Sequence, residues 1–252
     1  FRKGLKSMAF LTCHTGSASL GRSFCYNIVV PENSDGDIPT VLLLHGLSDD
    51  YTQWERMTPI ERYANERGIA VIMPDGARSF YTDMKYGDAY YSSIVCDVMR
   101  SARSLFPLSV KREKNFTAGL SMGGYGALKI ALKNPDVFSG AISLSGVLNI
   151  AKSAEDVTWD RDFTLIWGED YKNALPGSED DLFYLTDNIK GEKPRIFISC
   201  GDCDFMLGQN RDFREHIKDA GFDFRYEEHP GNHNWMYWAE HIAVGLDFIL
   251  GR

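Results

Sequence analysis

Ser121 lies at the centre of residues 119–123, whose Gly-x-Ser-x-Gly pattern has the spacing of a nucleophile elbow. In such an elbow the serine stands at a tight turn between a strand and a helix, and the glycines leave room for the backbone. Residues 115–118 predict the short strand, and residues 125–133 predict the helix. This context favours a nucleophilic serine over a serine in an ordinary glycine-rich turn.

A serine is a poor nucleophile near neutral pH unless a histidine accepts its proton and a carboxylate orients that histidine. His229 and His233 follow the last predicted strand, and His233 is favoured because a Gly-Asn pair gives it a mobile approach to the sheet edge. Asp202 and Asp204 both follow the preceding strand. The residues alone do not separate them, because the other carboxylate could serve as a first-turn acid of the next helix.

Acyl transfer also needs backbone N–H donors for the oxyanion, and two are expected. Met122 follows the nucleophile at the start of a helix, and Leu47 lies in the loop after strand Thr40–Leu44. His45 opens that loop and is expected to shape it rather than to act as a second base.

Other side chains are assigned more coarsely. Residues expected near the substrate are His45, Tyr81, Tyr86 and Trp235. The remaining histidines, His14, His216 and His241, are expected at the surface or on a helix face.

Short apolar strands alternate with amphipathic helices, which predicts an α/β fold with a mostly parallel central sheet and helices on both faces. The expected strands are residues 11–13, 23–30, 40–44, 69–74, 115–118, 141–146, 195–200 and 224–227. The first two look antiparallel. Because parallel strands end at one edge, the reactive residues are expected to meet there, and the order Ser, Asp, His is that of an α/β-hydrolase.

The helices have recognisable ends. Residues 58–61 have the pattern of a capping box, and Gly68 is expected to end that helix. A longer helix is predicted over residues 88–106, before Pro107. Residues 147–190 are acidic, rich in Trp and Tyr and without a clear strand, which predicts a cap-like insertion within one domain, residues 1–252.

Composition limits the partners. The chain has 252 residues, is 44% hydrophobic and carries a formal net charge of −8, which argues against nucleic acid or an anionic membrane as a partner. No apolar run is long enough to span a bilayer, and no signal-peptide pattern opens the sequence. Met8 is the expected natural start, which leaves open whether residues 1–7 are native.

The five cysteines are odd in number and scattered, so they do not form a disulfide framework. Cys200 and Cys203 form a C-x-x-C, but no second pair stands at zinc-finger spacing, and small residues at a strand end are the simpler interpretation. The expected location is the cytoplasm, and no metal or cofactor is expected.

Several pieces of the chain together resemble the esterase D branch of the α/β-hydrolases, with the closest likeness to bacterial tributyrin esterases and acetyl esterases. S-formylglutathione hydrolases, feruloyl and acetyl-xylan esterases and mycolyltransferases are more distant relatives. The matching pieces are Leu44-His45-Gly46, Trp54, Tyr81-Thr82-Asp83, Tyr86-Gly87, Tyr90-Tyr91, Lys111-Arg112-Glu113-Lys114, Gly119 to Gly126, Cys200-Gly201, Asp204-Phe205 and Gly231-x-His233-x-Trp235-x-x-Trp238.

The resemblance implies which of the two acids, Asp202 or Asp204, orients the histidine. The acid of this family stands three residues after the glycine of the Cys-Gly pair, which is Asp204, and the histidine matches His233. Met206 separates Phe205 from Leu207, a departure from the family that does not move the acid. The insertion at 147–190 matches poorly and corresponds to the small cap of the family.

The expected function is therefore a serine carboxylesterase that hydrolyses short-chain acyl esters through an acyl-enzyme. Three alternatives within the fold are a carbohydrate acetyl or feruloyl esterase, an S-formylglutathione hydrolase and an acyltransferase, and a non-catalytic binding module is the fourth reading. An acylated carbohydrate could stack on aromatic residues of the loop and insertion, namely Tyr81, Tyr86, Trp159 and Trp167. A homo-oligomer is compatible with the sequence.

Overall fold

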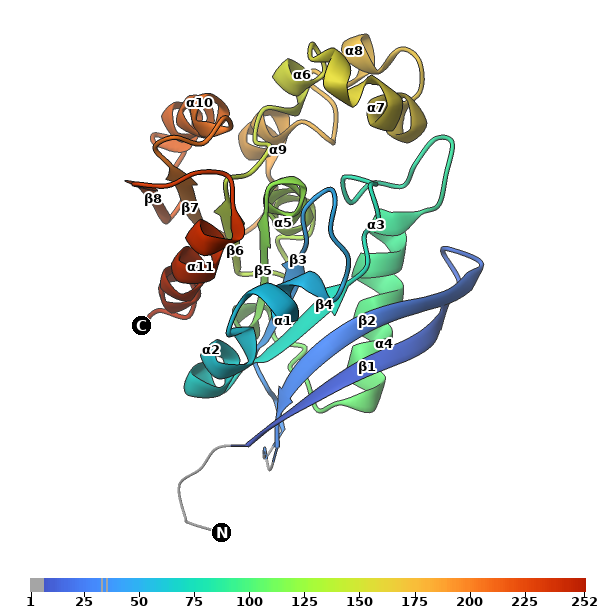
Figure 1. The fold of residues 1–252 in the computed structure, drawn as a ribbon, viewed down its shortest axis with the longest axis vertical. Helices are drawn as coiled ribbons and strands as arrows, with labels where there is room; N and C mark the ends of the chain where they lie inside the picture. The colour runs from blue at the N-terminus through green and yellow to red at the C-terminus, as the bar shows by residue number, and fades with distance from the viewer. Residues whose placement is uncertain (1–6, 33, 35) are drawn as a thin grey trace.

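The computed structural model describes residues 7–32, 34 and 36–252. Residues 1–6, which precede the expected start at Met8, lie outside the described residues. In this described part of the chain, one eight-stranded sheet has the strand order β1-β2-β4-β3-β5-β6-β7-β8 (Figure 1). This sheet, flanked by helices, confirms the predicted α/β-hydrolase fold.

All eight strands lie where the sequence predicts them. They are β1 (Met8–Ser17), β2 (Arg22–Pro31), β3 (Thr40–Leu44), β4 (Ala70–Pro74), β5 (Asn115–Leu120), β6 (Gly140–Leu144), β7 (Arg195–Gly201) and β8 (Phe224–His229). The β1–β2 and β2–β4 pairs are antiparallel, and the other neighbours are parallel. β1 is longer than expected because its pairing with β2 holds it as a strand although Phe10 and Leu11 remain exposed.

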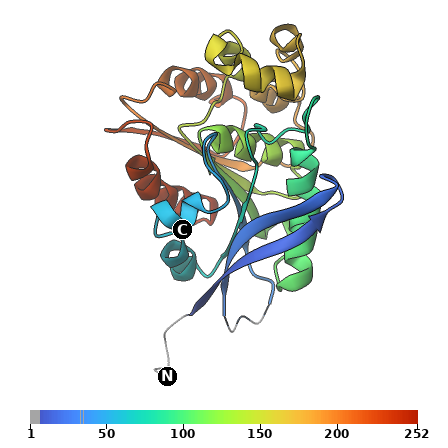
Figure 2. The same cartoon turned by 45° about the vertical axis from the view of Figure 1, so that its right-hand side comes forward.

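Two layers of helices bury the two faces of the sheet (Figure 2). One face packs against α1 (Gln53–Met57), α2 (Ile60–Arg67) and α11 (Trp235–Ile249). The other packs against α5 (Met122–Lys133), α10 (Leu207–Ile217) and the helical segment of α3 (Tyr90–Ser92), a π-helical stretch (Ser93–Val98) and α4 (Met99–Leu105). The central strands β3 to β6 are buried on both faces, which explains their continuous apolar sequence.

The predicted capping box at residues 58–61 is wrong. Pro59 is the N-cap of α2, and the Thr58 hydroxyl instead donates a hydrogen bond of 2.6 Å to the Trp54 carbonyl oxygen. The reason is the short helix α1, whose C-cap is Thr58: the Trp54 carbonyl oxygen accepts the Thr58 backbone N–H at 3.1 Å as well as the hydroxyl group. Gly68 ends α2 with a φ of 65°, as predicted.

The segment predicted as an insertion, residues 147–190, forms short helices. It contains α6 (Ile150–Ser153), a 3-10 turn (Val157–Trp159), α7 (Asp160–Trp167), α8 (Tyr171–Ala174) and α9 (Leu182–Asn188). Figure 1 shows α6, α7 and α8 as a group set off from the sheet. Phe163 is fully buried in this group, with edge-to-face contacts to Phe80, Trp167 and Tyr171. Within the described chain, no helix has the length and apolar character that crossing a membrane requires.

Asp97 links the β1–β2 hairpin to the π-helical stretch Ser93–Val98 through hydrogen bonds. One carboxylate oxygen accepts the Ser17 hydroxyl at 2.7 Å and the Ser19 N–H at 2.9 Å, and the other accepts Arg100 at 2.6 Å. Burial by itself would raise the pKa of Asp97, but these donors lower it from 3.8 to about 2. The π-helical stretch places the carboxylate at the end of β1.

Asp97→Asn is expected to lower the free energy of unfolding at pH 7 by about 2 kcal/mol. Because the folded pKa lies below the unfolded one, the carboxylate stabilises the fold above about pH 4, and this stabilisation is lost as the pH falls to about 2. Urea unfolding measured over this range should therefore show a shallower pH dependence in the variant. Asp136→Asn, at an exposed position, is the control, and equal slopes for Asp97→Asn and wild type would contradict the prediction.

Candidate active site

The elbow is built by a close approach between α5 and β3. Ser121 has φ 51° and ψ −119°, a strained conformation between β5 and α5 that the surrounding structure must enforce. A Cβ added to Gly119 would lie 2.2 Å from the Gly123 carbonyl oxygen, and one added to Gly123 would lie 2.4 Å from the Leu44 carbonyl oxygen. Both glycines are therefore required by contact with backbone atoms.

Ser121, His233 and Asp204 form a continuous hydrogen-bonded line. The Ser121 Oγ lies 3.0 Å from His233 Nε2, and His233 Nδ1 lies 3.0 Å from each Asp204 carboxylate oxygen. Because a carboxylate only accepts, Nδ1 carries the proton and Nε2 presents a lone pair to the serine. The Asp204 side chain is fully buried, whereas the His233 side chain is 16% exposed.

Backbone hydrogen bonds fasten the acid and base loops together after β7 and β8. The Asp202 N–H donates to the His229 carbonyl oxygen, and the Cys203 N–H donates to the Gly231 carbonyl oxygen, both at 2.9 Å. The exposed Asp202 carboxylate accepts the Gly231 N–H at 3.1 Å and does not contact His233. The structure thus separates the two acids: Asp204 contacts the histidine, and Asp202 supports its loop.

Aromatic side chains hold the His233 ring. Phe205 packs on it with ring centroids 4.4 Å apart, and Trp238 meets it edge to face at 4.9 Å. The Trp238 indole N–H donates to the Ser145 hydroxyl at 3.0 Å, which fixes this ring in turn. Neither residue was singled out from the sequence for a role in the site, although both lie in the pieces that carry the family resemblance.

A pocket of about 400 Å³ opens beside Ser121 and His233. Its lining is largely apolar and aromatic, with a few polar groups: Gly46, Leu47, Ser48, Asp49, Leu120, Ser121, Trp159, Phe205, His233, Asn234, Trp235 and Trp238. Leu47, predicted as an oxyanion donor, and Trp235, predicted as a substrate contact, are both in this lining. Met122 is buried and outside this lining; it is the first residue of α5, so its N–H has no acceptor within the helix.

The structure places three of the expected substrate contacts outside the pocket lining. His45 is buried behind it, where Nδ1–H donates to the Gly46 carbonyl oxygen at 2.7 Å and Nε2 accepts the Gly76 N–H at 2.8 Å. Tyr81 is fully buried, and its hydroxyl donates to the His45 carbonyl oxygen at 2.8 Å. Both side chains thus brace the loop that carries Leu47. Tyr86 is exposed and donates to Glu169 at 2.7 Å.

The other histidines differ in their surroundings. His14 is exposed, and His216 is partly buried beside Asp187, at 3.0 Å. His241 lies on α11 but not at the surface: it is only 7% exposed, because its ring stacks on that of His229 from β8. Burial, together with the neighbouring His229, lowers the pKa of His241.

Comparison with known proteins decides the family. A family model described as a putative esterase matches residues 17–249. An acetyl esterase of Caldicellulosiruptor saccharolyticus is 36% identical over 224 residues, which cover 84% of this chain and 84% of that protein. The chain belongs to this esterase family. The resemblance to esterase D-like α/β-hydrolases is confirmed.

Solved structures agree with this assignment. The fluorophosphonate-binding serine hydrolase FphF of Staphylococcus aureus superposes with a TM-score of 0.89 at 36% identity, covering 96% of this chain and 98% of that one. The S-formylglutathione hydrolase FrmB of the same organism gives 0.84 at 34% identity, covering 97% and 99%. The protein is thus a serine carboxylic ester hydrolase.

A buried ion pair anchors the insertion of this esterase to the nucleophile helix. The Lys129 ammonium group of α5 donates to Thr82 Oγ1 at 2.7 Å, to the Phe80 carbonyl oxygen at 3.2 Å and to Asp180 Oδ1 at 3.1 Å. The other Asp180 oxygen accepts the Trp167 indole N–H at 2.9 Å. Burial lowers the pKa of Lys129. The Lys129 charge holds the pKa of Asp180 below its ordinary value although burial alone would raise it.

Lys129→Met is expected to lower the free energy of unfolding by about 3–5 kcal/mol, because it leaves the Asp180 carboxylate without its counterion. Lys133→Met is the matched control: Lys133 lies one turn later on α5 and pairs at 3.1 Å with the exposed Glu179, so its loss should cost at most about 1 kcal/mol. Denaturant unfolding measures both. Equal stability of the two variants would show that the buried pair does not anchor the insertion.

Proposed function

We propose that the protein hydrolyses short-chain acyl esters through an acyl-enzyme formed on Ser121. The observation that supports this most directly is the line Ser121–His233–Asp204 at the wall of the pocket. It places a nucleophile, a base with its lone pair toward that nucleophile, and a buried carboxylate in the order that acyl transfer requires.

In the proposed first half-reaction, the Ser121 Oγ attacks the ester carbonyl carbon and His233 Nε2 takes the serine proton. The tetrahedral intermediate then collapses, and the same proton passes from Nε2 to the departing alkoxide, which leaves as an alcohol. Asp204 keeps the proton on Nδ1 and stabilises the imidazolium ion in between. In the second half-reaction, water attacks the acyl-serine by the same steps and releases the acid.

The Leu47 and Met122 N–H groups are the proposed oxyanion donors. Leu47 lies in the lining of the pocket, and Met122 begins α5, whose N-terminus also favours a developing negative charge. Each such donor typically lowers the barrier by about 3–4 kcal/mol. In this proposal His45 and Tyr81 are positioning residues, because their hydrogen bonds fix the backbone on which Leu47 stands.

The pocket supports a short acyl group. Its volume of about 400 Å³ lies at the small end for ligand sites, and three tryptophans form part of its lining, Trp159, Trp235 and Trp238. Trp159 comes from the insertion at 147–190, which we propose acts as a cap over the site. Tyr81 is fully buried, and Trp167 is partly buried with its indole N–H bonded to Asp180, and neither lines the pocket.

An S-formylglutathione hydrolase activity is the second candidate, because the structure of FrmB at 34% identity carries that name. A third is an acylated carbohydrate as substrate, which would bring its sugar against the exposed rim residue Phe205, 70% exposed. To compare these candidates, we would measure turnover of S-formylglutathione, acetylated xylan, feruloylated polysaccharide and nitrophenyl acetate. The relative rates would show which alcohol or thiol leaving group the enzyme prefers.

Ser121→Ala and Asp204→Asn are each expected to lower kcat on nitrophenyl acetate by about 10⁴-fold or more, because the first removes the nucleophile and the second reverses the histidine tautomer. Asp202→Asn is the control, since its amide oxygen still accepts the Gly231 N–H and the residue does not contact His233. Near-wild-type turnover by either of the first two variants would exclude the role assigned to that residue.

Trp159→Ala is expected to raise kcat/KM for nitrophenyl octanoate relative to nitrophenyl acetate by about tenfold, because removing the indole lengthens the acyl pocket. Val157→Ala is the matched control in the same turn, since Val157 is 74% exposed and outside the pocket lining. A chain-length profile of nitrophenyl esters measures the ratio. An unchanged ratio would place the acyl group away from the insertion.

A further inference from the structure

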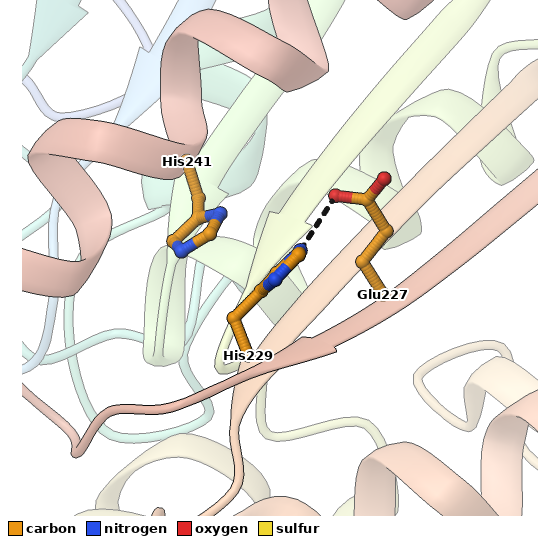
Figure 3. Close-up of side chains that lie close together, drawn as sticks. All are labelled: Glu227, His229 and His241. Carbon is orange, nitrogen blue, oxygen red and sulfur yellow. Dashed lines mark hydrogen bonds and ion pairs between the residues drawn. The ribbon is translucent and has the colours of Figure 1, made fainter.

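A second cluster of chemically reactive side chains lies between β8 and α11, outside the lining of the ester pocket. Glu227 and His229 are two residues apart on β8, so they project from the same face of the strand. Figure 3 shows His241 reaching toward them from α11. A ring nitrogen of each histidine and a carboxylate oxygen of Glu227 all lie within 4.8 Å of one another.

His241 carries a polar atom for which the fold provides no partner. Its Nδ1 is buried and has no hydrogen bond, and the residue is only 7% exposed. Buried polar groups are nearly always paired, and leaving one unpaired costs about 1–3 kcal/mol. The ring is confined between His229, at a centroid distance of 4.6 Å, and Tyr237, at 4.0 Å.

The donor set matches a transition-metal ion. Two imidazoles and one carboxylate are the protein ligands of many zinc sites that keep a water in the fourth position. Glu227 Oε2 and His229 Nε2 are 3.1 Å apart, close to the separation of about 3.3 Å between two ligands on a tetrahedral zinc ion. Arg225 binds the other carboxylate oxygen and so orients Glu227 from outside the cluster.

One adjustment is needed. The His229 and His241 rings are nearly parallel, at 19°, so one must turn before both nitrogens face a common ion. His229 can make this movement, because its side chain is 43% exposed and lies on the edge strand. When the ring turns, the hydrogen bond between His229 Nε2 and Glu227 breaks, and both groups coordinate the same metal ion instead.

We propose that Glu227, His229 and His241 form a binding site for one divalent transition-metal ion, with zinc as the best match. The ion links the end of β8 to α11, on either side of the loop that carries His233. Its role is structural, since none of the three side chains lines the ester pocket. The proposal does not depend on which ester the protein hydrolyses.

The test is calorimetric titration of the purified full chain with zinc chloride. We expect the wild type to bind one zinc ion per chain. Glu227→Gln and His229→Ala should each bind zinc at least about tenfold more weakly, because losing a metal ligand lowers the affinity at least as much as losing a residue that only orients a ligand. His216→Ala is the matched control: it removes another histidine–carboxylate pair, with Asp187, and should leave the affinity unchanged.

Two further readouts locate the ion. Zinc should raise the melting temperature of the wild type and of His216→Ala but not of the two ligand variants. Cobalt in place of zinc should give visible absorption bands of a four-coordinate site without a thiolate charge-transfer band, which excludes the exposed Cys203. Absence of binding by the wild type, or equal binding by all variants, would overturn the proposal. Ester hydrolysis should persist in the presence of a chelator.

Discussion

The site depends on one close contact, between the first turn of α5 and the end of β3. Gly123 lies against the Leu44 and His45 carbonyl groups at a distance that excludes even a methyl group. This contact fixes the elbow at Ser121 and at the same time sets the loop with Leu47 beside it. The tight packing therefore determines two parts of the site, the nucleophile and the loop opposite, through backbone atoms alone.

A second close backbone contact, between the turn after β7 and the loop after β8, positions His233 beside Ser121. A Cβ on Gly201 would lie 2.4 Å from the Gly231 carbonyl oxygen, so the turn after β7 and the loop after β8 meet without side chains between them. Asp204 and His233 thus sit on two segments that are hydrogen-bonded to each other, while Ser121 sits on a third. The parallel sheet brings all three to one edge.

Much of this could be predicted from the sequence, because strands buried on both faces leave long apolar runs and because glycine spacing marks the elbow. The choice between Asp202 and Asp204 needed the family resemblance, since both follow the same strand. Tertiary contacts decided where the predicted substrate contacts lie. Tyr81 looks like a binding residue in a loop, yet its hydroxyl group is hydrogen-bonded to the His45 carbonyl oxygen away from the pocket lining. The sequence predicts both that His45 shapes the loop after β3 and that it lies near the substrate, and its hydrogen bonds agree with the first of these roles. The burial of His241 depends on how α11 meets β8, which no local pattern records.

The edge-to-face contact between Trp238 and His233 makes the proposed base a part of the hydrophobic packing of the fold. Trp238 is only 5% exposed, lies on α11 and donates its indole N–H to the Ser145 hydroxyl, directly after β6. The ring that faces the histidine is therefore held jointly by a sheet strand and by the helix that covers it. A substitution that shifts α11 against β6 would move the imidazole, so the rate of ester hydrolysis is sensitive to packing far from the pocket.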